Sequence, residues 1–272
     1  MDLPGSPAGS TPQATGPLGF PGAQPIALIA AAFGSDQMIV ADGGQDKHMK
    51  AVALTCFSDV LCIWAYIAQP RIELLKKTYG DAVALDARFC SVFGDALRKI
   101  RTDWKEKGEY QGFNAHLRQA AEAFPEIPLH RDIWLTVRPP SSMGPHLFLT
   151  AMRCAESEGR LPVGTAGIAT LAFRRAFFEE GLDIACLDIQ HDICRQLGVD
   201  AAAVTARIED GSAFAALATD YKDAEGMGIQ GSPTFVLNSG RQKLYGNVGY
   251  RILEANVHEL VREPKEGQAS WC

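Results

Sequence analysis

The sequence contains no pair of cysteines at CxxC spacing, although cysteine is not rare in it. Seven cysteines stand at positions 56, 62, 90, 154, 186, 194 and 272, without a regular framework spacing. An odd and scattered set of thiols is typical of a reducing compartment rather than of a disulfide-stabilised secreted protein. Cys186, His191 and Cys194 lie close together in the chain, but their spacing matches no zinc signature and a fourth ligand is missing. We therefore expect a cytoplasmic protein with free thiols and no metal site.

The chain also lacks a long apolar run and an excess of positive charge. Its best apolar stretch, Pro25 to Gly34, is shorter than the roughly 18 to 20 residues that a membrane span needs. The formal net charge is -6, and the lysines and arginines form no basic stripe that would follow a phosphate backbone. The sequence thus predicts a globular protein that binds neither a membrane nor nucleic acid. It gives no indication of an oligomeric state.

The first 48 residues are poor in charge and rich in residues that disfavour a packed core. Residues 1–25 hold six prolines and five glycines, with Asp2 as their only charge. The first basic residue is Lys47, which follows the apolar stretch, so the basic region that opens a secretory signal is missing. We expect residues 1–48 to be a disordered extension outside the fold.

Hydrophobic periodicity predicts a β-α-β unit at the start of the remaining chain. Residues 50–57 alternate like a strand, residues 63–79 follow helical spacing up to Gly80, and residues 81–90 return to strand character. Such a unit favours a parallel strand pair with a right-handed crossover. Pro70 is expected to kink the intervening helix. Further helices are expected at residues 95–107, 113–123, 143–158, 166–180, 187–197, 201–208 and 212–225.

The C-terminal part again combines strands with a helix. Residues 234–238 and 242–245 read as a β-hairpin, and residues 250–261 read as a helix. A β-α-β half, a helical insertion and a β-β-α half are the arrangement of an α/β thioredoxin-like fold with a large inserted all-helical domain. We expect the first half at 49–94, the insertion at 95–225, the second half at 226–262 and a tail at 263–272.

Two local sequences resemble those of the DsbA family. Residues 58–68 read SDVLCIWAYIA and resemble the strand-to-helix active-site segment, in which many members read SD-V-x-C-P-W-C-Y. Residues 228–237 read GIQGSPTFVL and resemble the family's G-x-x-G-x-P-T-F-V loop, whose proline is cis. The two motifs occur in the right order around a helical block of suitable size. The resemblance covers nearly all of residues 49–261 and implies the same thioredoxin-like fold.

The chain departs from the redox members of that family at two positions of the first motif. Ile63 stands where a proline is common, and Ala65 stands where the second cysteine would be. The resulting C-x-x-A motif makes a dithiol cycle within it impossible. Kappa-class glutathione transferases and 2-hydroxychromene-2-carboxylate isomerases also resemble this chain, because they have one reactive residue, usually serine, at the position of Cys62. Both resemblances imply that function depends on this position.

Cys62 follows a strand and opens a helix, where free N–H groups and the helix dipole favour a thiolate. We therefore expect its pKa to lie below the ordinary value of about 8.5. The alternative is a small buried hydrophobic residue, which is the role we assign to Cys56 and Cys90. The resemblance implies a cis Ser232–Pro233 bond, with Pro233 within van der Waals reach of the Cys62 sulfur. The N–H and C=O of Ser232 would then pair with an extended thiol substrate, such as glutathione or a peptide.

Four further residues are candidates for the site. Trp64 would shield the thiolate or contact the substrate, and packing in the core is an equal alternative. Asn247 and Arg251, at the start of the last helix, would bind the γ-glutamyl carboxylate of glutathione, although a helix cap and a solvated side chain explain them equally well. Cys272 is a candidate resolving thiol, since a tail of about ten residues spans up to roughly 33 to 36 Å. The alternative is a mobile end without function.

Three functions fit this sequence. The first is a thiol-disulfide oxidoreductase with one active-site cysteine, in which glutathione or a distant cysteine resolves the mixed disulfide. The second is a glutathione-dependent isomerase or transferase that acts on a small electrophile. The third is a redox-inactive binding module. Cysteine rather than serine at position 62 favours the first, and the missing cysteine at position 65 favours the second. We expect glutathione as a co-substrate and no tightly bound cofactor.

Overall fold

The structure is a computed structural model, and it describes residues 51–262. Four strands form one mixed sheet in the order β2-β1-β3-β4. β1 (Val52–Ser58) pairs in parallel with β2 (Val83–Phe89) and antiparallel with β3 (Thr234–Leu237). β3 forms a hairpin with β4 (Gln242–Tyr245). The expected α/β thioredoxin-like fold, with its parallel pair and its hairpin, is confirmed.

Two helices join β1 to β2 where the sequence predicted one kinked helix. α2 (Ile63–Ile67) and α3 (Gln69–Tyr79) are separated by one residue, Ala68. Pro70 stands in the first turn of α3, where a missing N–H costs no hydrogen bond within the helix. The predicted kink is thus confirmed as a break between two helices, which separates the short helix after Cys62 from the rest.

The helical insertion follows β2, and α11 (Tyr250–Val261) closes the described fold. Most predicted helices agree with the structure to within two residues. Of the first two, one ends at Asp103 instead of residue 107, and the other begins at Glu109 instead of residue 113, directly after Gly108, whose φ of 87° favours glycine. The insertion contains α4 (Ala96–Asp103), α5 (Glu109–Glu122), α6 (Met143–Ser157), α7 (Thr165–Phe178), α8 (Leu187–Gln196), α9 (Ala201–Glu209) and α10 (Ser212–Gly226). Short 3-10 turns occupy Gly80–Ala82, Lys105–Lys107 and Asn238–Gly240.

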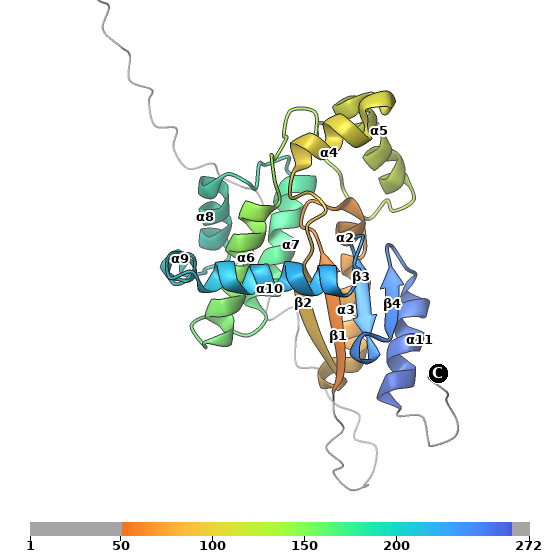
Figure 1. Cartoon of the computed structure of the whole chain (residues 1–272), viewed down its shortest axis with the longest axis vertical. Coiled ribbons are helices and arrows are strands. Elements are labelled where there is room, and N and C mark those ends of the chain that lie inside the picture. The colour runs from red at the N-terminus through yellow and green to blue at the C-terminus, as the bar shows by residue number, and fades with distance from the viewer. Residues whose placement is uncertain (1–50, 263–272) are drawn as a thin grey trace, which may run out of the picture.

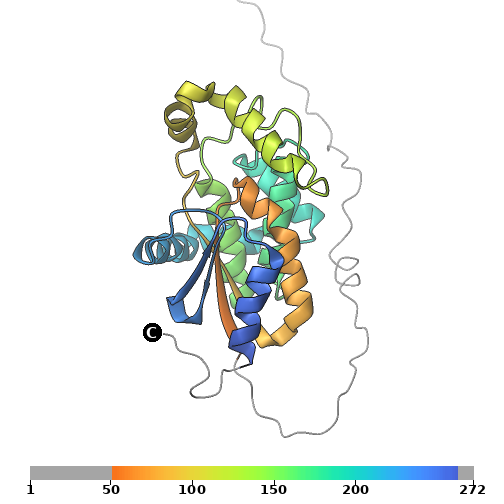
Figure 2. The same cartoon turned by 90° about the vertical axis from the view of Figure 1, so that its right-hand side faces the viewer.

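Helices cover both faces of the sheet, and the strand side chains alternate between them. Leu54 and Phe235 pack with α3 and α11 on one face, while Phe57 and Val236 pack against α10 on the other. Figures 1 and 2 show α3 and α11 on one side of the sheet and α10 crossing the opposite side. The central strands are therefore buried on both faces, and the site lies where β1 ends.

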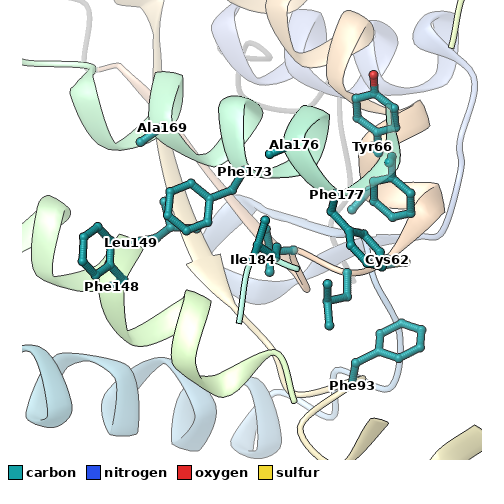
Figure 3. Packing of buried hydrophobic residues seen from close by; sticks show 14 of the residues in the cluster. Cys62, Tyr66, Phe93, Phe148, Leu149, Ala169, Phe173, Ala176, Phe177 and Ile184 are labelled. Carbon is teal, nitrogen blue, oxygen red and sulfur yellow. The ribbon is translucent and has the colours of Figure 1, made fainter. Parts of the chain in front are cut away.

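The largest core cluster lies in the insertion and extends to α2. Phe148 of α6 packs against Phe173 of α7 with ring centroids 6.0 Å apart, and Tyr66 of α2 stacks on Phe178 of α7 at 5.3 Å. Figure 3 shows Cys62 and Tyr66 at one end of this cluster. The insertion therefore holds the helix that follows Cys62. No helix in the described part of the chain is long and apolar enough to cross a membrane.

Candidate active site

Cys62 and the loop that contains Pro233 meet at the end of β1. The Ser232–Pro233 peptide bond is cis. The Cys62 thiol donates a hydrogen bond to the carbonyl oxygen of Ser232, with 3.1 Å between sulfur and oxygen. Cys62 and Ser232 are both buried. The predicted cis bond and the facing of the two loops are thus confirmed, and the sulfur contacts the residue that precedes Pro233.

A tight turn after β1 places Cys62 at the start of α2. The Asp59 carboxylate accepts a hydrogen bond from Leu61 N–H at 2.9 Å, and the Asp59 carbonyl accepts one from Cys62 N–H at 3.1 Å. Cys62 itself has extended backbone angles, and its carbonyl accepts the first helical bonds, from Ala65 and Tyr66. Its sulfur therefore lies beside the N-terminus of α2, as the strand-to-helix motif predicts.

Burial raises the pKa of the Cys62 thiol, and the negative charge of Asp59 adds to this effect. Hydrogen bonds from Ser232 and from the Ala65 backbone oppose it without overcoming it. The predicted lowering of this pKa is wrong for the site in this structure, because loss of solvent outweighs the N-terminus of a short helix. Cys62 is therefore a protonated thiol at neutral pH, as its hydrogen bond to a carbonyl oxygen requires.

Asp59 is fully buried and connects the Cys62 loop to three other parts of the chain. Its carboxylate accepts hydrogen bonds from the N–H groups of Val92 and Phe93, at 3.0 and 2.8 Å, and from the Ser142 hydroxyl at 2.8 Å. Its own N–H donates to the Ser232 hydroxyl at 2.8 Å. Such charge-assisted bonds are stronger than neutral ones. Asp59 thus fixes the thiol loop relative to the cis-proline loop and to the insertion.

His146 of α6 holds the same loop from the insertion. Its Nε2 accepts a hydrogen bond from Val60 N–H at 3.0 Å, so the ring proton is on Nδ1, 2.8 Å from the Tyr221 hydroxyl. The 3.6 Å between Nε2 and Asp59 Oδ1 is therefore not an ion pair. Burial lowers the pKa of His146 to about 4. His146 thus positions the loop as a neutral imidazole.

We expect stability to fall as the pH drops from about 6.5 towards 4, because the folded protein keeps His146 neutral in this range. The unfolded chain binds the proton there, which costs up to about 1.4 kcal/mol for each pH unit. His146→Gln should flatten this part of the curve, whereas His116→Gln, at an exposed histidine, should not. Urea unfolding across this pH range measures both. Equal slopes in His146→Gln and the wild type would contradict the assignment.

The structure describes the surroundings of three other predicted residues, and a fourth, Cys272, lies outside residues 51–262. Trp64 is partly buried and packs edge-to-face against Phe124. Asn247 does not cap α11; its side-chain oxygen accepts a hydrogen bond from Arg71 instead. Arg251 is exposed in the first turn of α11, where no described hydrogen bond holds it. Cys272 lies outside the described residues, so its resolving role stays a prediction.

Two further thiols lie buried near the site. Cys90 follows β2, and its sulfur lies 3.9 Å from the carbonyl oxygen of Gly231, the residue before Ser232. Cys56 lies within β1, and burial raises its pKa to about 11; burial also raises the pKa of Cys90. Both are therefore protonated thiols at neutral pH. Among residues 51–262, no group of three or more metal-binding side chains is arranged around a common point.

Sequence reasoning missed three side chains of the site: Asp59, His146 and Arg174. Arg174 of α7 is only 3% exposed, and its guanidinium donates to Gln69 Oε1 at 2.8 Å and to Ser58 Oγ at 2.9 Å. The sequence carries a weak signal for two of them. Asp59 belongs to the first motif, and Arg174 lies in an apolar run, FRRAFF, where one of two adjacent arginines must share a face with phenylalanines.

A family model described as a DSBA-like thioredoxin domain matches residues 53–257. A search of curated proteins finds no match. Among solved structures, the chain is similar to a probable DsbA oxidoreductase from Streptomyces coelicolor, with 18% identity and a TM-score of 0.61. This likeness covers 80% of the present chain and 94% of the other.

Two other solved structures share the fold at similarly low sequence identity. The cytosolic disulfide reductase DsbM from Pseudomonas aeruginosa, solved with GSH, is 19% identical with a TM-score of 0.53, over 77% of this chain and 96% of that one. A 2-hydroxychromene-2-carboxylate isomerase is 20% identical with a TM-score of 0.54, over 78% of this chain and 97% of that one. At such low identity these likenesses show the fold alone.

Proposed function

This chain belongs to the DSBA-like thioredoxin domain family, and we propose on that premise that it is a monothiol thiol-disulfide oxidoreductase whose reactive group is Cys62. The observation that carries the proposal is the contact between the Cys62 sulfur and the Ser232 carbonyl, beside a cis proline and a helix N-terminus. We propose a cytoplasmic location as well, which agrees with the scattered free thiols and is the location named for DsbM.

The proposed substrate is a protein or peptide thiol that carries glutathione in a mixed disulfide. The Cys62 thiolate attacks the glutathione sulfur, a Cys62–glutathione disulfide forms, and the substrate leaves as a thiolate that takes up a proton. A second glutathione thiolate then attacks the glutathione sulfur on Cys62 and leaves as oxidised glutathione. One disulfide is thereby exchanged for another, and Cys62 returns to its starting state. Because burial raises the pKa of Cys62, the rate should rise with pH above neutrality.

The groups around Cys62 suit an extended thiol substrate. In this proposal the backbone of Ser232, which precedes the cis proline, offers a strand edge to which a glutathione or peptide backbone can pair. Trp64 covers the substrate from α2. The γ-glutamyl carboxylate is bound at Asn247 and Arg251, near the N-terminus of α11. The name of DsbM with GSH supports a glutathione partner. No tightly bound cofactor takes part.

Exposure of the protein to oxidised glutathione should give a glutathione adduct on Cys62. Peptide mass spectrometry identifies the modified cysteine, and the rate of modification should increase with pH because the thiol pKa is raised. Cys62→Ser should lose this adduct. Cys90→Ser is the matched control, because it removes a buried thiol beside the same loop and should keep the adduct on Cys62. Modification of other cysteines with Cys62 untouched would contradict the proposal.

A glutathione-dependent isomerase or transferase is the second candidate. The observation that favours it is Ala65, which is buried in α2 where a second thiol would stand, so the motif contains one sulfur. In that reaction the Cys62 S–H would donate a hydrogen bond to the glutathione sulfur and orient it. Tight glutathione binding without an adduct would support this function. Neither binding nor an adduct would instead support a redox-inactive binding module.

A further inference from the structure

Arg174 is a buried cation without a carboxylate partner in the described part of the chain. Its side chain is 3% exposed, and its two hydrogen bonds go to the neutral groups of Gln69 and Ser58. Its buried Nε has no hydrogen-bond partner among the described residues. Removing a guanidinium from water costs several kcal/mol unless another charge compensates it. The buried charge of Arg174 therefore indicates that an anion forms near it at some stage.

The contacts of Arg174 place its side chain against the segment from Ser58 to Gln69, which contains Cys62. Ser58 is the last residue of β1 and Gln69 is the first residue of α3, so the guanidinium joins the two ends of this segment. Tyr66 of α2 stacks on Phe178, which lies one turn further along α7 on the same face as Arg174. Figure 3 shows α7 beside Cys62 and Tyr66. The packing of α2 on α7 thus keeps the cation and the thiol in one buried region.

Most charged groups around Arg174 are already satisfied or neutral. Asp59 accepts hydrogen bonds from three backbone N–H groups and a hydroxyl, and His146 is neutral. Burial disfavours the charge of the guanidinium, and a negative charge on Cys56, Cys62, Asp59 or Cys90 would favour it, Cys56 most and Cys90 least. The thiol that ionises during the proposed reaction is Cys62. Five titratable groups face Arg174. Cys56 is in β1, Asp59 and Cys62 follow β1, Cys90 follows β2, and His146 is in α6.

We propose that Arg174 is a positioning residue whose fixed charge stabilises the Cys62 thiolate inside the protein. This inference rests on the proposed function, since it assigns a task to the thiolate of that reaction. The charge promotes ionisation of the thiol before attack on a disulfide, and it stabilises the same thiolate when Cys62 leaves the mixed disulfide. Folding by itself gives no reason to keep the charge, because well-packed apolar residues often replace buried charges at no cost in stability.

The test is the rate of Cys62 alkylation as a function of pH, followed by peptide mass spectrometry so that each cysteine is measured separately. Arg174→Met removes the charge and should shift the midpoint to higher pH by about one unit, with about a tenfold lower rate at neutral pH. Arg174→Lys should keep most of the wild-type profile. Arg175→Met is the matched control, because it removes an exposed arginine from the next position of α7.

Two outcomes would overturn the inference. One is an unchanged profile in Arg174→Met, and the other is an equal shift in Arg175→Met. If Arg174→Met does not fold, Arg174→Gln decides, because it can keep polar contacts with Ser58 and Gln69 while removing the charge. Alkylation reports on the thiol itself rather than on turnover. If Arg174→Met shifts the alkylation profile as expected but the wild type exchanges no disulfides, the proposed function is contradicted and the role of Arg174 stands.

Discussion

Replacing Cys62 with serine should lower the rate of thiol-disulfide exchange by about 1000-fold or more. A hydroxyl does not form the thiolate that attacks a disulfide, and no second cysteine stands in the motif. The fold should survive, because a serine hydroxyl can donate to the same Ser232 carbonyl oxygen that now accepts the S–H. The measurement is single-turnover reduction of a glutathionylated peptide by the wild type and by the variant.

Cys90→Ser separates loss of the reactive thiol from loss of a buried thiol. Cys90 is as buried as Cys62 and lies against the carbonyl of the preceding loop residue, Gly231. Its own pKa is strongly raised by burial, so this variant should keep most of the exchange rate. If Cys62→Ser retained activity and Cys90→Ser lost it, the assignment of the nucleophile would be wrong.

Asp59→Ala should destabilise the protein by about 3 to 5 kcal/mol, the loss typical of breaking a buried charged network. The carboxylate is fully buried, and its removal leaves the N–H groups of Leu61, Val92 and Phe93 and the Ser142 hydroxyl without an acceptor. Leu61, Phe93 and Ser142 are buried, so water cannot fully replace the carboxylate at these donors. Urea unfolding at neutral pH measures the loss.

Asp95→Ala provides the matched control for that measurement. Asp95 also accepts a backbone hydrogen bond, from Arg98 N–H, but it does so as the exposed N-cap of α4. Such a cap contributes about 1 kcal/mol. A similar loss of stability in Asp59→Ala and Asp95→Ala would show that burial of the carboxylate network is not what makes Asp59 important.

Much of the fold could be predicted because its elements are encoded by short-range patterns. The helix expected at residues 143–158 is observed as Met143–Ser157, and Pro70 marks the break between α2 and α3. The pattern was less accurate around residues 104–112: α4 ends at Asp103, before the predicted residue 107, and α5 begins at Glu109, directly after Gly108. Periodicity and backbone preferences act within a few residues, so one sequence is enough to read them.

The site could be predicted only in part, because its chemistry depends on residues far apart in the chain. The motifs identified Cys62 and the cis proline, but the direction of the thiol pKa depends on how completely the fold excludes water. Arg174 and Ser58 meet across 116 positions of sequence, and no local pattern predicts that contact. Asn247 lies at a position that suits a helix cap, but its side-chain oxygen accepts a hydrogen bond from Arg71 of α3 instead.

The pairing of β1 with β3 has a consequence for the order in which contacts form as the protein is synthesised and folds. Thr55 lies opposite Val236, so the entire insertion is synthesised between the two strands that meet at the site. Helices rich in local contacts form quickly, whereas strands so distant in the chain pair late, after a long loop has closed. During synthesis the Cys62 thiol therefore leaves the ribosome well before Ser232 and Pro233 exist. Until β3 pairs with β1 the sulfur lacks its hydrogen bond to the Ser232 carbonyl oxygen, so this contact forms late in folding.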